Sequence, residues 1–228
     1  PLDLLEDLAQ DDDSEVRQSV AEQLGVLTDA IKISRRKQED DLALGLLNVA
    51  FLLVEDDSDG VVAAAEDATA TVATLCTTGE ERAFLISRVE QLCRCEEEEI
   101  RISGSKIAGE LAEVLGAETT ASTLAPLLTE LSKDDALQVR EATVRATVRA
   151  GETMRGTDAV IQLFDIFSSL ANDPVWSVRK ACADSLVGLS KSVGQDAFAA
   201  FAQELFETLA NDVSLQVRPG MLENLGPL

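Results

Sequence analysis

The chain has 228 residues, of which 46% are hydrophobic and only 4% aromatic, with no Tyr and no His. Ala, Leu, Val, Glu and Asp dominate, a composition typical of packed helices, so we expect an all-α fold rather than a β-sandwich or β-barrel. The 42 acidic residues outnumber the 19 basic ones and give a net charge of -23, which argues against nucleic acid and anionic membranes as ligands.

A β-branched residue, followed by Arg in five of six copies, recurs along the chain at intervals of 45, 39, 39, 39 and 39 residues. The copies are Val16-Arg17, Val61-Val62, Ile100-Arg101, Val139-Arg140, Val178-Arg179 and Val217-Arg218. A Leu stands eight residues before each copy, and small residues follow three positions after it. This period accommodates two amphipathic helices around a short turn. Neither helix can bury its apolar face alone, so the pattern predicts an α-solenoid of stacked helical hairpins.

The repeat divides the chain, in order, into about six hairpins. Their expected bounds are residues 1–31, 40–77, 79–116, 118–151, 157–192 and 195–228. We expect these to form one solenoid segment over residues 1–228. Neither end carries the polar capping repeat that a solenoid requires, so the segment is expected to be an internal part of a longer array.

The first interval is six residues longer than the others, and the extra residues are expected around Ile31–Asp40. This stretch holds the densest positive charge of the chain, at Arg35, Arg36 and Lys37. Two interpretations stay open, a solvated loop between repeats or an electrostatic contact to an acidic partner.

An Asp five residues before the Val-Arg pair is expected to accept hydrogen bonds from backbone N–H groups that open the second helix, and the Arg is expected to reach a carboxylate of its own or the next repeat. We call this predicted series the Asp-Arg ladder. Its predicted members are Asp11, Arg17, Asp134, Arg140, Asp173, Arg179, Asp212 and Arg218. Val62 replaces one Arg and Cys95 replaces one Asp, so the ladder should be interrupted there and the second and third repeats more loosely coupled. The alternative role for the arginines is binding of a phosphorylated ligand.

The last three turns each carry a large apolar residue just before the Val-Arg pair, and the first three do not. These residues are Leu137, Trp176 with its neighbour Val175, and Leu215. We call the row they form the turn ridge. Equivalent turns line up along a solenoid, and a few large side chains carry most of the energy of an interface, so the turn ridge is the predicted partner-binding site. Alternatively, Trp176 folds back as a local cap over the helix ends.

The sequence offers no recognisable catalytic, cofactor or metal site. It has no His to serve as a general base and no P-loop pattern. The cysteines Cys76, Cys93, Cys95 and Cys182 lie in helical patterns without CxxC spacing. We interpret them as small buried hydrophobic residues in a reducing compartment, and we expect no enzyme activity, no cofactor and no bound metal.

Paired helices at this period with an L-x-x-D-x-x-x-x-V-R pattern resemble HEAT repeats. Within them, the segment DPVWSVRKACADSLVGLSKSVG, residues 173–194, is similar to repeats of the scaffold and regulatory subunits of type-2A-like Ser/Thr protein phosphatases, including the regulatory subunits of phosphatase 4 and the scaffold subunits of phosphatase 2A. In that family, turns with Trp just before Val-Arg receive the catalytic subunit. The resemblance implies that Trp176 contacts a phosphatase catalytic subunit.

The expected function is therefore a non-catalytic scaffold or regulatory subunit of such a phosphatase, located in the cytoplasm, with the nucleus and the cilium left open. One alternative is a structural solenoid within a large ciliary or organellar assembly. Another is a transport-type solenoid whose acidic inner face carries basic cargo. No membrane insertion is expected, because no apolar run is long enough to span a bilayer.

Overall fold

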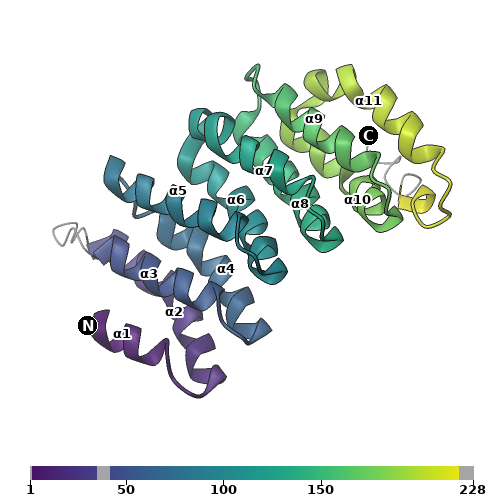
Figure 1. Cartoon of the computed structure of the whole chain (residues 1–228). Helices are drawn as coiled ribbons and strands as arrows, with labels where there is room; N and C mark the ends of the chain where they lie inside the picture. The colour runs from purple at the N-terminus through teal and green to yellow at the C-terminus, as the bar shows by residue number, and fades with distance from the viewer. Residues whose placement is uncertain (1, 35–41, 221–228) are drawn as a thin grey trace. The chain divides into compact units, whose positions relative to one another are not determined.

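The computed structural model describes residues 2–34 and 42–220, and all regular structure in these ranges is helical (Figure 1). Eleven α-helices and one π-helical segment alternate with short turns there. In chain order they are α1 (Leu2–Leu8), α2 (Ser14–Ser34), α3 (Leu42–Val54), α4 (Asp59–Ala73), α5 (Gly79–Cys93), α6 (Glu98–Thr119), η1 (Thr120–Leu124), α7 (Ala125–Leu131), α8 (Leu137–Met154), α9 (Val160–Ala171), α10 (Trp176–Val193) and α11 (Gln195–Ala210). The prediction of an all-α solenoid of about six hairpins is confirmed.

The helices gather into two compact units, residues 1–96 and residues 97–228, here called unit 1 and unit 2. In unit 1, α1 pairs with α2 and α3 with α4, while α2 packs on α4 and α3 on α5. Helix α3 is apolar around most of its circumference because neighbours cover it on several sides, and its Leu46, Leu47 and Phe51 are fully buried. The core of unit 1 therefore lies along α3 and the inward faces of α2 and α4.

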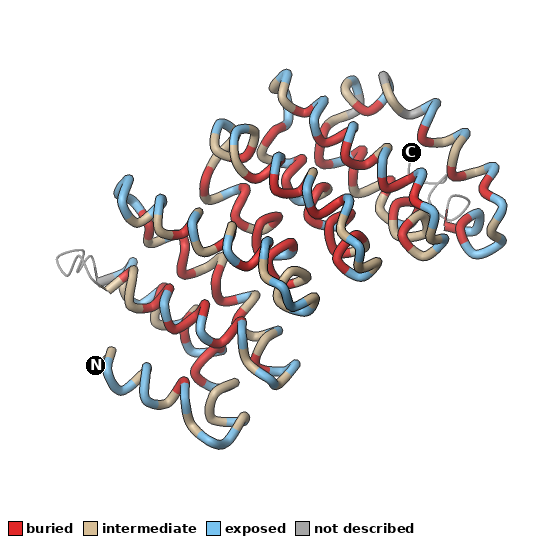
Figure 2. Tube along the Cα trace, in the orientation of Figure 1, coloured by how far each residue is buried: buried red, intermediate tan, exposed pale blue. Residues whose placement is uncertain are grey.

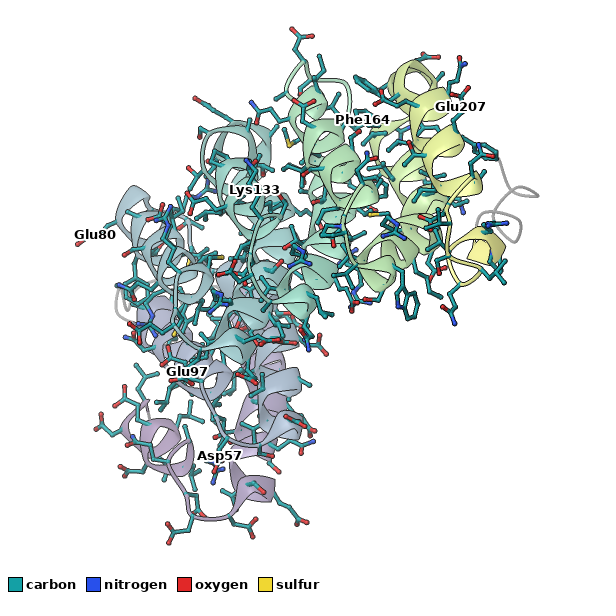
Figure 3. The ribbon with its side chains drawn as sticks, turned by 45° about the vertical axis from the view of Figure 1, so that its right-hand side comes forward. Asp57, Glu80, Glu97, Lys133, Phe164 and Glu207 are labelled. Atoms are coloured by element: carbon teal, nitrogen blue, oxygen red, sulfur yellow. The ribbon has the colours of Figure 1, made fainter. Side chains whose placement is uncertain are left out.

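In unit 2 the second helices of successive hairpins, α6, α8 and α10, stack side by side, and α7, α9 and α11 form a second row (Figure 1). Buried residues follow the inward sides of these helices (Figure 2). Small residues allow a close approach: a Cβ added at Gly109 on α6 would lie 2.7 Å from the Cα of Ala146 on α8. Phe164 of α9 faces α11, where its ring stacks on Phe201 at 4.1 Å between centroids (Figure 3).

The junction between the third and fourth repeats differs from the expected break at residue 117. Helix α6 continues to Thr119 through a kink at Gly116, where φ is 82° and ψ is 169°, and π-helical η1 follows directly. The left-handed φ favours Gly at this position. The buried Thr120 hydroxyl donates to the Gly116 carbonyl at 2.8 Å and also reaches the carbonyl of Ala112, on the other side of the kink, at 3.3 Å. The third and fourth repeats are thus joined by a bent helical segment.

The expected repeat bounds stay a prediction. Helix α2 runs to Ser34, and the basic cluster Arg35, Arg36 and Lys37 lies outside the described residues. The division of the whole chain into one solenoid segment stays a prediction. Within residues 2–34 and 42–220, no helix combines the length and apolar character needed to cross a bilayer.

Candidate functional site

The turn between the two helices of a repeat is organised by its Asp. Asp134, which follows α7, accepts on Oδ1 a hydrogen bond of 2.9 Å from the backbone N–H of Ala136, the residue directly before α8. The same contact recurs in the other turns, from Asp13 to Asp11, Ser58 to Asp56, Val175 to Asp173 and Ser214 to Asp212. An Asp at this place satisfies a backbone donor that the helix start leaves open and so stabilises the start of the second helix in these five turns.

Three of the Val-Arg arginines, Arg17, Arg140 and Arg179, reach in two directions. Arg140 on α8 donates from Nε to Asp173 Oδ2 at 2.6 Å and from Nη2 to Asp173 Oδ1 at 3.1 Å, a fork-shaped contact with the next turn. Its Nη1 donates to the carbonyl of Asp134, in its own turn, at 2.6 Å. The equivalent forks join Arg17 to Asp56, Arg101 to Asp134 and Arg179 to Asp212. Each such Arg thus connects two successive turns.

Three predicted ladder members have other or additional contacts. Arg17 also donates to Asp57 at 2.9 Å. Arg218 donates from Nε to the carbonyl of its own Asp212 at 2.5 Å. Asp11 accepts from the backbone of its own turn. The function of the ladder in setting the angle between repeats stays a prediction, as does the interruption at Val62 and Cys95.

The forks determine the electrostatics of the ladder carboxyl groups. Hydrogen bonds from Arg17 lower the pKa of Asp56, and those from Arg179 lower the pKa of Asp212, against the opposing effect of burial. At Asp134, burial is the largest single influence and raises the pKa, but the hydrogen bonds from Arg101 and the Ala136 N–H, together with the charges of Arg101 and Arg140, outweigh it, and the pKa is lowered. These carboxylates are therefore held in the charged, acceptor form.

The predicted turn ridge lies in unit 2, and its residues differ in exposure. Trp176 is the first residue of α10 and 44% exposed, and Leu215 is 75% exposed. Leu137 and Val175 are only partly exposed. Val213, directly after the ladder residue Asp212, is 88% exposed and was not anticipated. Its position is equivalent to Pro174 in the preceding turn, so an apolar residue after the turn Asp is the signal that would have found it.

The described residues form neither a metal site nor a disulfide. Across residues 2–34 and 42–220, no group of His, Cys, Asp and Glu side chains could hold a metal ion. No disulfide joins the four cysteines. Burial raises the pKa of the Cys76 thiol to about 11 and that of Cys182 well above its ordinary value, so both thiols stay protonated at neutral pH. The candidates for a functional site are therefore the ladder, the exposed apolar turns and the acidic surface.

Comparison with known proteins agrees with the fold. The family model of the HEAT repeat matches residues 2–31 and 163–193. No curated protein sequence matches the chain. A chain from a structure of Kap95p binding to RanGDP superposes with a TM-score of 0.71 at 16% identity, over 98% of this chain and 30% of that chain.

Two artificial solenoids are also similar. A designed armadillo repeat protein in complex with the peptide (KR)4 gives a TM-score of 0.54 at 17% identity, covering 99% of this chain and 98% of that chain. An engineered protein gives a TM-score of 0.54 at 18% identity, covering 99% and 95%. At such low identities the likeness establishes the fold, an α-solenoid of the HEAT and armadillo kind, and leaves the partner to be argued from the surface.

Proposed function

From an α-solenoid with HEAT repeats and exposed apolar turns, we propose that this protein is a non-catalytic scaffold that binds a protein partner through its turn ridge. The observation that carries the proposal is the exposure of Trp176, Val213 and Leu215 on consecutive turns of unit 2. Removing large apolar side chains from water stabilises a complex, and Trp is enriched among the residues that contribute most to the binding energy of an interface. The bonded turn backbone reduces the ordering cost of docking.

The partner we propose is the catalytic subunit of a type-2A-like Ser/Thr phosphatase, for which this chain would be a scaffold or regulatory subunit. The support is the resemblance of residues 173–194 to repeats of those subunits, with Trp176 at the position that receives the enzyme. The placement of Trp176 as the first residue of α10, partly open to solvent, is compatible with this role.

The test is affinity purification of the full-length protein from its own cells, comparing wild type with Trp176→Ala and with Leu215→Ala. Ile161→Ala is the matched control, because Ile161 is an exposed apolar residue of the same unit that lies on α9, away from the turns. We expect a phosphatase catalytic subunit to be recovered with wild type and control and to decrease with the two ridge variants. Recovery of a stable large particle without phosphatase would contradict the phosphatase assignment and favour the structural solenoid.

A second candidate function is transport or capture of basic protein segments. Two observations favour it: the excess of acidic residues, and the similarity to a structure concerned with nuclear import complex assembly and to a designed solenoid in complex with (KR)4. Strongly salt-dependent binding of Lys- and Arg-rich peptides would support this function, because ionic contacts at an exposed surface weaken with ionic strength. Binding that is insensitive to salt would contradict it.

A further inference from the structure

Unit 1 has a groove between its two second helices, α2 and α4, which pack side by side (Figure 1). The groove has a volume of about 560 Å³, and its lining is mostly small and apolar. Helix α2 contributes Gln18, Ala21, Glu22 and Gly25, and α4 contributes Gly60, Ala63, Ala64, Asp67, Ala68 and Thr71. The alanines and glycines leave room for another backbone to approach the two helices closely.

Two carboxylates stand on opposite sides of this groove, and no basic side chain lines it. Glu22 and Asp67 occupy the same position in successive repeats, five residues after Arg17 and Val62 respectively. Both are exposed, and the contact of Glu22 is a neutral one, from Gln18 Nε2 at 2.9 Å. Asp67 forms no ion pair with any described residue.

The basic residues of unit 1 that the structure describes are engaged elsewhere. Arg17 is held by the ladder, Arg88 contacts Glu55, Arg94 contacts Glu90 and Lys32 contacts Asp29. The remaining one, Arg82 at the start of α5, donates to the carbonyl of Cys76 and does not line the groove. Residues 1–96 contain 22 acidic side chains and 8 basic ones. The negative potential of the groove is therefore not neutralised by the described part of its own unit.

The corresponding groove of unit 2, between α6 and α8, is electrostatically different. It is lined by Glu110, Glu113, Glu152 and Arg149 among others, and Arg149 Nε donates to Glu110 Oε1 at 2.8 Å across the groove. A second contact joins Arg149 Nη2 to Glu110 Oε2. The two grooves thus share an architecture, but in unit 2 an internal cation neutralises one carboxylate, whereas in unit 1 both carboxylates lack a cation.

We propose that the α2–α4 groove binds an extended peptide segment with neighbouring Lys or Arg side chains. In an extended chain, successive side chains point to opposite sides, so two consecutive basic residues would reach Glu22 on one wall and Asp67 on the other. Their aliphatic stems would lie over the methyl groups of Ala63 and Ala64, which are exposed and partly exposed.

This inference rests on the second of the two proposed functions and assigns it a site. The test uses the full chain and a fluorescently labelled octapeptide of alternating Lys and Arg, with binding followed by anisotropy at low and at physiological ionic strength. The groove variant is Glu22→Gln combined with Asp67→Asn. The matched control is Glu113→Gln combined with Glu152→Gln, which removes the same charge from the groove of unit 2. A third variant, Ala63→Trp, fills the groove at an exposed position without changing any charge.

We expect the groove variant to bind the peptide roughly tenfold more weakly than wild type, and the control to stay within about twofold. Ala63→Trp is expected to weaken binding to a similar degree as the charge variant. Circular dichroism melting checks that each variant is folded. Equal weakening by groove variant and control, or unchanged binding by Ala63→Trp, would overturn the site while leaving basic-segment binding intact. Absence of peptide binding to wild type would overturn both.

Discussion

Replacement of one ladder aspartate, Asp173→Ala, is expected to destabilise unit 2 by about 3 kcal/mol, because removing one partner of a buried ion pair costs about 3–5 kcal/mol. The Arg140 and Asp173 side chains are only 11% and 5% exposed, so the guanidinium left behind would remain largely shielded from water. We expect the lower end of this range of destabilisation, because Arg140 Nη1 keeps its hydrogen bonds to the carbonyls of Asp134 and Asp135. The substitution also leaves the Val175 N–H without its acceptor.

The double variant Arg140→Met with Asp173→Ala separates the ion pair from the turn contact. With both charges gone, the expected loss is about 1–2 kcal/mol, close to that of a missing helix cap. The measurement is the free energy of opening of α9 and α10 by native-state hydrogen exchange, since solenoid unfolding need not be two-state. The reasoning would be refuted if Asp173→Ala lowered this free energy by less than about 1 kcal/mol. It would also be refuted if the loss in the double variant equalled the sum of the losses in Asp173→Ala and Arg140→Met alone.

Three further outcomes are expected. The double variant Val62→Arg with Cys95→Asp supplies the missing Asp-Arg pair, with the same separation of 33 residues as in the Arg101–Asp134 fork. It should slow hydrogen exchange in α4 and α5 more than either single change does. Exchange rates equal to those of wild type would contradict this expectation. A carboxyl group whose pKa is lower in the folded than in the unfolded chain stabilises the folded chain at pH values above its unfolded-state pKa, which is 3.8 for Asp. This stabilisation is lost as the pH falls below that value toward the folded-state pKa. Those groups are Asp56, Asp134 and Asp212. Acid titration followed by circular dichroism should therefore be less steep for Asp134→Asn, and an unchanged slope would count against the pairing. Iodoacetamide at neutral pH should modify the partly exposed Cys95 before the buried Cys76, as peptide mass spectrometry can check; equal rates would show that Cys76 is accessible.

The sequence was informative where the structure repeats itself. A turn Asp and an Arg six residues later recur in a fixed register, so periodicity alone located the turns and the two helices around each. The contact between Arg140 and Asp173 could be anticipated because both residues belong to every regular copy, and stacking of equivalent copies brings equivalent residues to equivalent neighbours.

Features that depend on a single junction or on stacking were not accessible in this way. The kink at Gly116 and η1 arise where Thr120 packs back against the end of α6, an arrangement that occurs at one junction and has no period. The α2–α4 groove exists because two helices that are separate in sequence lie side by side, and sequence alone did not place Glu22 opposite Asp67.

The ladder has a consequence for binding as well as for stability. Asp173 holds the N–H of Val175, and Trp176 is the next residue, so the same carboxylate that receives Arg140 fixes the backbone from which the Trp side chain projects. A binding residue on a fixed backbone loses less conformational entropy when a partner docks. In unit 1 the fork holds Arg17 at Asp56, and no basic side chain lines the α2–α4 groove. The arrangement that stabilises the turns thus contributes to both proposed binding surfaces, the apolar turns of unit 2 and the acidic groove of unit 1.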